Sequence, residues 1–139
     1  MTYDRHQYCF QLINKYLYTS ICKKMNIEEL RDYCLQKKGV EETFPFGELT
    51  LVYKVGGKIF LIASVDEGNR FNAKCDPERA VELRERYSEI IPGYHMNKKH
   101  WNSVYMDGGL PRALLLEIID HSYELVFESL PKKIKHELI

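Results

Sequence analysis

The stretch "LTLVYKVGGKIFLIAS" (residues 49–64) decides the fold that this sequence predicts. Two runs rich in β-branched and aromatic residues flank Gly56-Gly57, a strong signal for a two-residue β-hairpin. Side chains alternate between the two faces of a strand. The first run therefore places Leu49, Leu51, Tyr53 and Val55 on one face, and Thr50, Val52 and Lys54 on the other.

Other β-rich segments lie on both sides of this hairpin. "RFNAKC" (70–75) predicts a third strand after the turn "DEGN" (66–69). Upstream, "ETFPFGE" (42–48) predicts an edge strand or a loop, because Pro45 cannot donate to a strand ladder. "HWNSVYM" (100–106) predicts a further strand, which ends at the turn "DGG".

Three segments carry helix signals. Asn26 followed by Glu29 predicts a capped helix over 27–37, and Asp76-Pro77 begins another in "DPERAVELRERY" (76–87). "LPRALLLEIIDHSYELVFESL" (110–130) has the widest apolar stripe and predicts the main core helix. The basic segment "KKIKHELI" (132–139) is expected to be a frayed tail. The fold class is α+β: an antiparallel sheet with helices packed on one face.

The chain divides near Met25. Residues 1–24 show a helical stripe of Cys9, Leu12, Ile13, Tyr16 and Leu17, and form either an extra helix or an upstream extension of a domain over residues 25–139. The length of 139 residues suits one domain. No apolar stretch approaches the roughly 20 residues of a membrane span, and the N-terminus does not have the pattern of a secretory signal. Four dispersed cysteines predict reduced thiols. We expect a soluble, cytoplasmic protein.

Charge limits the possible partners. The net charge is zero, and residues 25–139 hold 16 basic against 19 acidic residues. Nucleic-acid binding proteins normally show clustered positive charge. Contact with DNA would therefore need a local basic patch.

The segment "PGYHMNKKHW" (92–101) is the densest cluster of chemically active side chains. Its two histidines lack the HExxH spacing and a third ligand, so no metal site is predicted. No serine or cysteine nucleophile motif accompanies them, and Cys75, beside a helix start that lowers a thiol pKa, has no evident base. We expect no enzyme and no cofactor. The alternative of catalysis by Tyr94, His95 and His100 would need a convergent pocket with a strongly shifted histidine.

Basic residues are predicted to gather on one side of the sheet. If the strands pair through the predicted turns, Lys54, Arg70 and Lys74 line one open face of the sheet, with Lys58 at the hairpin end. Such a face suits phosphate contacts, but ordinary solvated lysines give the same pattern. In the 92–101 segment, Trp101 is predicted to be buried against the helix that follows Pro111. The exposed groups there are His95, Lys98, Lys99 and His100.

Motifs in fixed order resemble the MmcQ/YjbR family of small bacterial proteins. They are "GVEETFPFG", "VYKVGGKIF", "NAKCDPE", "PGYHMNKKHWNSV" and "IDHSYELV" with "LPKK". The resemblance covers about residues 26–135 and leaves out residues 1–24. The matching positions are Phe44, Pro45, Phe46, Gly47, Lys54, Gly57, Lys58, Lys74, Pro92, Gly93, Tyr94, His95, Asn97, Lys98, His100, Trp101 and Asn102.

The resemblance implies a frataxin-like (CyaY-like) α+β domain and no known reaction. Family members are commonly described as DNA-binding, from a likeness to a double-wing architecture, which is an argument by analogy. We therefore expect a non-enzymatic protein that binds DNA through Lys54, Lys58, Arg70, Lys74, His95, Lys98, Lys99 and His100. The alternative is a binding module for a small anionic molecule or a protein partner, which uses the same cluster beside "FPFG".

Overall fold

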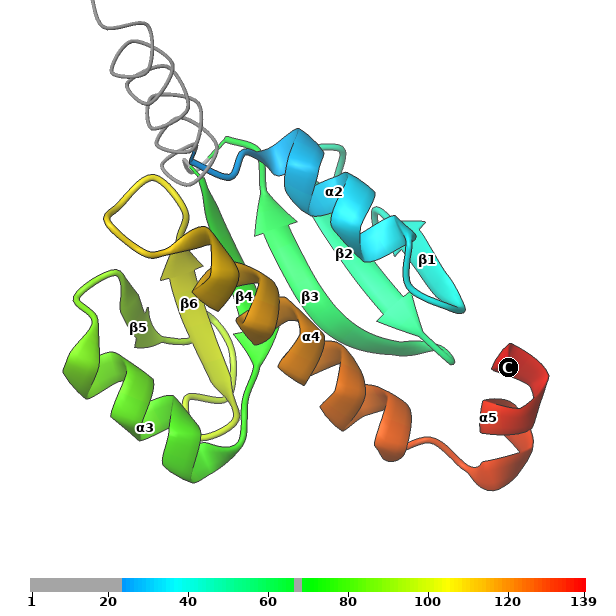
Figure 1. The fold of residues 1–139 in the computed structure, drawn as a ribbon. Helices are drawn as coiled ribbons and strands as arrows, with labels where there is room; N and C mark the ends of the chain where they lie inside the picture. The colour runs from blue at the N-terminus through cyan, green and yellow to red at the C-terminus, as the bar shows by residue number, and fades with distance from the viewer. Residues whose placement is uncertain (1–23, 67–68) are drawn as a thin grey trace, which may run out of the picture.

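A six-stranded antiparallel sheet forms the centre of the molecule, in the strand order β1-β2-β3-β4-β6-β5 (Figure 1). The computed structural model describes residues 24–66 and 69–139, so the helix predicted within residues 1–24 falls almost entirely outside the described part. The strands are β1 (Val40–Thr43), β2 (Thr50–Val55), β3 (Lys58–Ser64), β4 (Arg70–Lys74), β5 (Ile90–Pro92) and β6 (Trp101–Tyr105).

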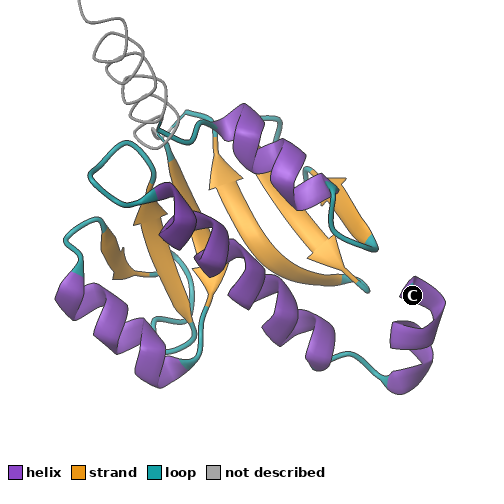
Figure 2. Ribbon diagram, viewed as in Figure 1, coloured by secondary structure: helices purple, strands orange, loops and turns teal. Residues whose placement is uncertain are grey.

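Three helices cover one face of this sheet: α2 (Ile27–Leu35), α3 (Pro77–Arg86) and α4 (Arg112–Glu128). Figure 2 shows them in front of the sheet, with α4 across the middle strands β3 and β4, α2 near β1 and α3 near β5. The predicted caps form, because Asn26 accepts the N–H of Glu29 at 2.8 Å and Asp76 accepts that of Arg79. The predicted α+β class, with helices on one face, is confirmed. No helix in the described residues is long and apolar enough to cross a membrane.

The β2–β3 hairpin turns at Gly56 and Gly57, as predicted. Both residues have positive φ values, 57° and 81°, as a two-residue hairpin of this type needs. Farther along, the register between β2 and β3 shifts, so that Phe60 is an extra residue in β3. Ser122 of α4 satisfies the backbone at this bulge: its hydroxyl donates to the Phe60 carbonyl and accepts the N–H of Lys74.

The structure corrects one expectation and adds one strand that was not predicted. Residues 132–139 are not a frayed tail, because Lys132–Leu138 form a helix, α5. Ile134 and Leu138 pack against the core, where Gly56 and Gly39 leave room for them. In addition, Ile90–Pro92 form the short strand β5, which pairs with β6 at the edge of the sheet. Only three residues long and ending in proline, β5 is too short to show a period of two.

Candidate nucleic-acid interface

The face of the sheet opposite the helices is the setting of the candidate site. On β4, Phe71 and Ala73 are buried in the core, so the alternation of the strand directs Arg70, Asn72 and Lys74 to the other side. No helix in the described ranges lies on that side (Figure 1). We call it the open face; it carries Lys54 on β2, Ile62 on β3, Arg70, Asn72 and Lys74 on β4, and Trp101, Ser103 and Tyr105 on β6.

Trp101 lies on this open face, which corrects the prediction that it is buried against the helix after Pro111. Its neighbour Asn102 is buried on the helical side, where its amide donates to the Ala80 carbonyl of α3. Successive residues of a strand point to opposite faces, so the Trp101 indole points away from the helices. Trp101 is half-buried rather than enclosed.

β4 and β6 pair so that each aromatic residue faces a cation. Lys74 lies opposite Trp101, and Arg70 lies opposite Tyr105. Between these pairs, Asn72 lies opposite Ser103. Directly opposed side chains have Cβ atoms about 4.5–5.5 Å apart, close enough to touch. The open face therefore has two aromatic–cation rows separated by a polar row.

Lys54 joins this set from β2. On the helical side, the Tyr53 hydroxyl donates to Glu42, which also accepts from Arg31 of α2. Lys54 follows Tyr53 and so points to the open face, opposite Glu41 of β1. One strand separates β2 from β4, so Lys54 and Lys74 are about 10 Å apart across the sheet.

The segment after Pro92 folds over the β4–β6 end of the open face. The Tyr94 N–H donates to Ser103 Oγ at 2.9 Å, and the Asn72 amide donates to the Tyr94 carbonyl at 3.2 Å. The Ser103 hydroxyl in turn donates to Asn72 Oδ1. These bonds fix the Tyr94 backbone on the sheet, with its ring centroid 4.9 Å from the Arg70 guanidinium carbon.

His95 stands next to this contact. It is the one described residue other than glycine with a positive φ, 58°, and its ring centroid is 4.0 Å from that of Tyr94. Both side chains are exposed. His95 and Tyr94 therefore form a rim at one end of the open face.

The other predicted cations point elsewhere. The pleat directs Lys58 to the helical side at the end of the hairpin, because Ile59 beside it pairs with Lys54. Lys98 turns back on its own loop, where its ammonium donates to the Gly93 carbonyl at 3.3 Å. His100 is half-buried, and its carbonyl accepts the Cys75 N–H at 2.8 Å. The eight predicted residues therefore do not form one surface: Lys54, Arg70 and Lys74 lie on the open face, with Arg70 and Lys74 at opposite ends of β4, and His95 follows Tyr94 near Arg70.

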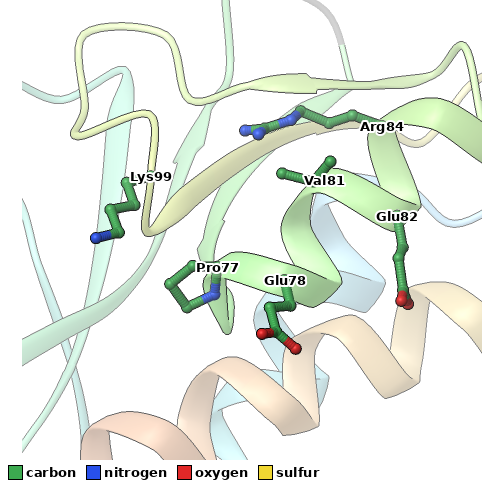
Figure 3. A pocket seen from close by; sticks show the side chains of 6 residues that line it. All are labelled: Pro77, Glu78, Val81, Glu82, Arg84 and Lys99. Carbon is green, nitrogen blue, oxygen red and sulfur yellow. The ribbon is translucent and has the colours of Figure 1, made fainter.

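Lys99 borders a separate hollow of about 550 Å³ between α3 and the 93–100 loop (Figure 3). Pro77 and Val81 line it, together with Arg84, whose guanidinium already donates to the Lys98 carbonyl at 2.8 Å. Glu78 and Glu82 are its acidic members. Two cations and two carboxylates leave the hollow without net charge.

The thiols of the described residues are poor nucleophiles. Burial raises the pKa of Cys34 to about 12 and that of Cys75 to about 11. Arg79 lowers the pKa of Cys75, but by less than burial raises it. The position of Cys75 near the start of α3 therefore does not lower its pKa, contrary to what such a position normally does. In the described part of the chain, no three His, Cys, Asp or Glu side chains gather as a metal site.

The fold and the open face define an α+β domain whose antiparallel sheet is covered by helices on one side only. A family model described as YjbR matches residues 35–125. The uncharacterized protein YbdF of Escherichia coli O157:H7 is 42% identical over 107 residues, which are 76% of this chain and 88% of YbdF. The uncharacterized protein YjbR of Escherichia coli K12 is 33% identical over 116 residues, 83% of this chain and 98% of that protein. The chain belongs to the YjbR family, which confirms the resemblance found in its motifs.

Solved structures show the same fold. Protein DR2400 of Deinococcus radiodurans superposes with a TM-score of 0.78 at 38% identity, over 83% of this chain and 88% of that one. A protein from Pseudomonas syringae superposes with a TM-score of 0.63 at 24% identity, over 73% of this chain and 99% of that one, a likeness of fold alone.

Proposed function

We propose that this chain is a non-enzymatic, cytoplasmic protein that binds DNA through the open face of its sheet. One observation carries the proposal: Lys54, Arg70 and Lys74 stand on the face of the sheet that no described helix covers, with Trp101 and Tyr105 on the same face. Basic side chains interleaved with aromatic rings suit a nucleic-acid strand, since cations contact phosphates and rings contact bases.

The distribution of charge supports this choice of face. Helix α4 has four carboxylates and one arginine, and α2 has three carboxylates and one arginine, whereas α3 is balanced. On the open face, the strands contribute three cations and a single carboxylate, Glu41. The strands of the open face thus have a positive excess of two charges, while α2 and α4 together have a negative excess of five and α5 adds three lysines and one glutamate. Between the sheet face and the two helices α2 and α4, the local basic patch that DNA contact requires is on the open face.

The alternative of a small anionic ligand has less support. The hollow bordered by Lys99 has balancing glutamates, and its Arg84 is already engaged with the loop backbone. An anion there would gain little net electrostatic attraction. The open face has its cations on two strands, with Arg70 and Lys74 at opposite ends of β4, a spacing that suits a polymer of phosphates better than a single anion.

The test is fluorescence anisotropy with a labelled oligonucleotide, offered as a duplex and as a single strand at low salt. We expect wild-type protein to bind at least one form, and the double variant Lys54→Glu, Lys74→Glu to bind at least tenfold more weakly. Each phosphate contact contributes about 0.7 to 0.9 to the slope of log affinity against log salt. The variant should therefore flatten this slope by between about 1.4 and 1.8.

The matched control is Lys132→Glu with Lys133→Glu, which changes net charge equally at exposed positions on α5. We expect this control to bind nearly as well as wild type. Equal losses in the two double variants would show that only net charge matters, and would refute the open face as the site. Absence of binding to both forms at tens of micromolar protein would refute DNA binding itself.

A further inference from the structure

The two aromatic–cation rows on β4 and β6 indicate which form of DNA the open face recognises. Trp101 and Tyr105 are four residues apart on one strand, so their rings rise from the same face about 13 Å from each other. Each has a cation directly opposite, Lys74 for Trp101 and Arg70 for Tyr105. The pattern thus offers a flat ring and a positive charge together, twice along one line.

A flat ring contributes to DNA binding mainly when a base face is free to stack on it. In a duplex, both faces of each base are covered by its neighbours, and proteins reach base edges by placing a helix or ribbon in a groove. Helices α2, α3 and α4 all lie on the opposite side of the sheet, so the open face has none to insert. An unpaired strand exposes its bases, and every base has a π-face.

The Asn72–Ser103 row separates the two aromatic–cation rows and is itself covered by the Tyr94 backbone, so each aromatic–cation pair is a separate contact point for one base and one phosphate. The two side chains bond each other and hold the Tyr94 backbone from both its N–H and its carbonyl. The exposed Tyr94 ring is thereby held near Arg70, at the same end as Tyr105. Trp101, Tyr105 and Tyr94, the last of them on a loop held to the sheet by hydrogen bonds, therefore lie next to the cations of the open face.

We propose that the open face binds single-stranded DNA, with Trp101 and Tyr105 stacking on bases while Lys74 and Arg70 contact the adjoining phosphates. This inference rests on the proposed DNA binding and narrows it to the unpaired form. The competing interpretation is that each pair is an ordinary cross-strand contact on a solvated sheet. Stacking distinguishes the two, because it changes the environment of the indole.

Trp101 is the only tryptophan among the 139 residues, so tryptophan emission, excited selectively over that of the ten tyrosines, reports on this site alone. The experiment titrates wild-type protein at low salt with a 12-nucleotide oligothymidine and, separately, with a 12-base-pair duplex. We expect the single strand to quench the tryptophan emission and to bind at least tenfold more tightly than the duplex. Trp101→Ala and Tyr105→Ala, followed by anisotropy, should each weaken single-strand binding about tenfold, since stacked bases contribute effects of this size.

Phe46→Ala is the matched control, because Phe46 is an exposed aromatic residue, 66% accessible, on the β1–β2 loop away from β4 and β6. It should leave binding unchanged.

Circular dichroism and thermal melting check that the variants fold. If Trp101→Ala does not fold, the affinity of Tyr105→Ala and the quenching of tryptophan emission in the wild-type protein still test the stacking proposal. Duplex bound as tightly as single strand, or emission unchanged at saturating single strand, would overturn the stacking proposal and leave DNA binding intact. Binding to neither form would overturn both.

Discussion

His121 links α4 to the beginning of α3. Its Nε2 accepts the backbone N–H of Asp76, the cap residue of α3, at 3.2 Å. Burial lowers the pKa of His121, and the nearby Arg79 lowers it further, while Asp76, Glu117 and Glu124 act in the opposite direction. The folded protein thus favours the neutral imidazole, which alone has a free lone pair for this bond.

This contact predicts how stability changes with pH. The pKa of His121 is lower in the folded state than the ordinary value of 6.5, so the unfolded chain takes up a proton first as pH falls. The contribution of His121 to stability should be fully present above about pH 6.5 and decrease below it. We expect His121→Gln, whose amide oxygen can accept the same N–H, to show a smaller fall in the free energy of unfolding between about pH 7.5 and 5.5. Urea titrations at several pH values measure this; parallel curves for the two proteins would contradict it.

At the scale of elements, α5 depends on the turn of the β2–β3 hairpin. A Cβ at Gly56 would lie 2.6 Å from a methyl group of Leu130, which is buried at the corner between α4 and α5. A Cβ at Gly57 would meet no atom within 4 Å, although both glycines have positive φ. A side chain would therefore strain the backbone at both positions, but only at Gly56 would it also collide with a packed residue.

Alanine at each glycine separates these effects. Gly57→Ala should lower the free energy of unfolding by about 1–2 kcal/mol, the cost of a side chain in a left-handed conformation. Gly56→Ala should cost at least about 1 kcal/mol more, because the added methyl group displaces Leu130. Urea unfolding of both variants measures the difference. Equal losses would show that the α4–α5 corner does not pack on the turn.

Most of the helices, strands and turns could be predicted from the sequence, but two elements could not. Local signals predicted the hairpin at Gly56-Gly57, the caps at Asn26 and Asp76, and the long helix after Pro111, because each depends on neighbouring residues. The helical state of 132–139 was missed because it depends on contacts with Gly39 and Gly56, about 80 to 100 positions earlier. β5 was missed because three residues pairing at an edge leave no periodic pattern.

At the scale of the whole molecule, the candidate site was only partly predictable. Alternation within each strand, together with pairing through the predicted turns, placed Lys54, Arg70 and Lys74 on one side of the sheet. The pairing of Lys74 with Trp101 could not be predicted from the sequence, because α3 and β5 separate β4 from β6 in the chain and no short turn sets the register of the two strands. The alternation in "HWNSVYM" already indicated that Trp101, Ser103 and Tyr105 share one face of a strand. This indication was not used, because Trp101 was expected to be buried against a helix.

The central claim is that DNA contacts the open face of the sheet, and an NMR titration tests its location most directly. Amide shifts of ¹⁵N-labelled protein would be followed while DNA is added at low salt. We predict that the largest changes fall on Lys54, Asn72 and Lys74, and on Trp101 to Tyr105, while α2 and α4 stay nearly unchanged. Changes concentrated on the helices, or no changes at saturating DNA, would contradict the account.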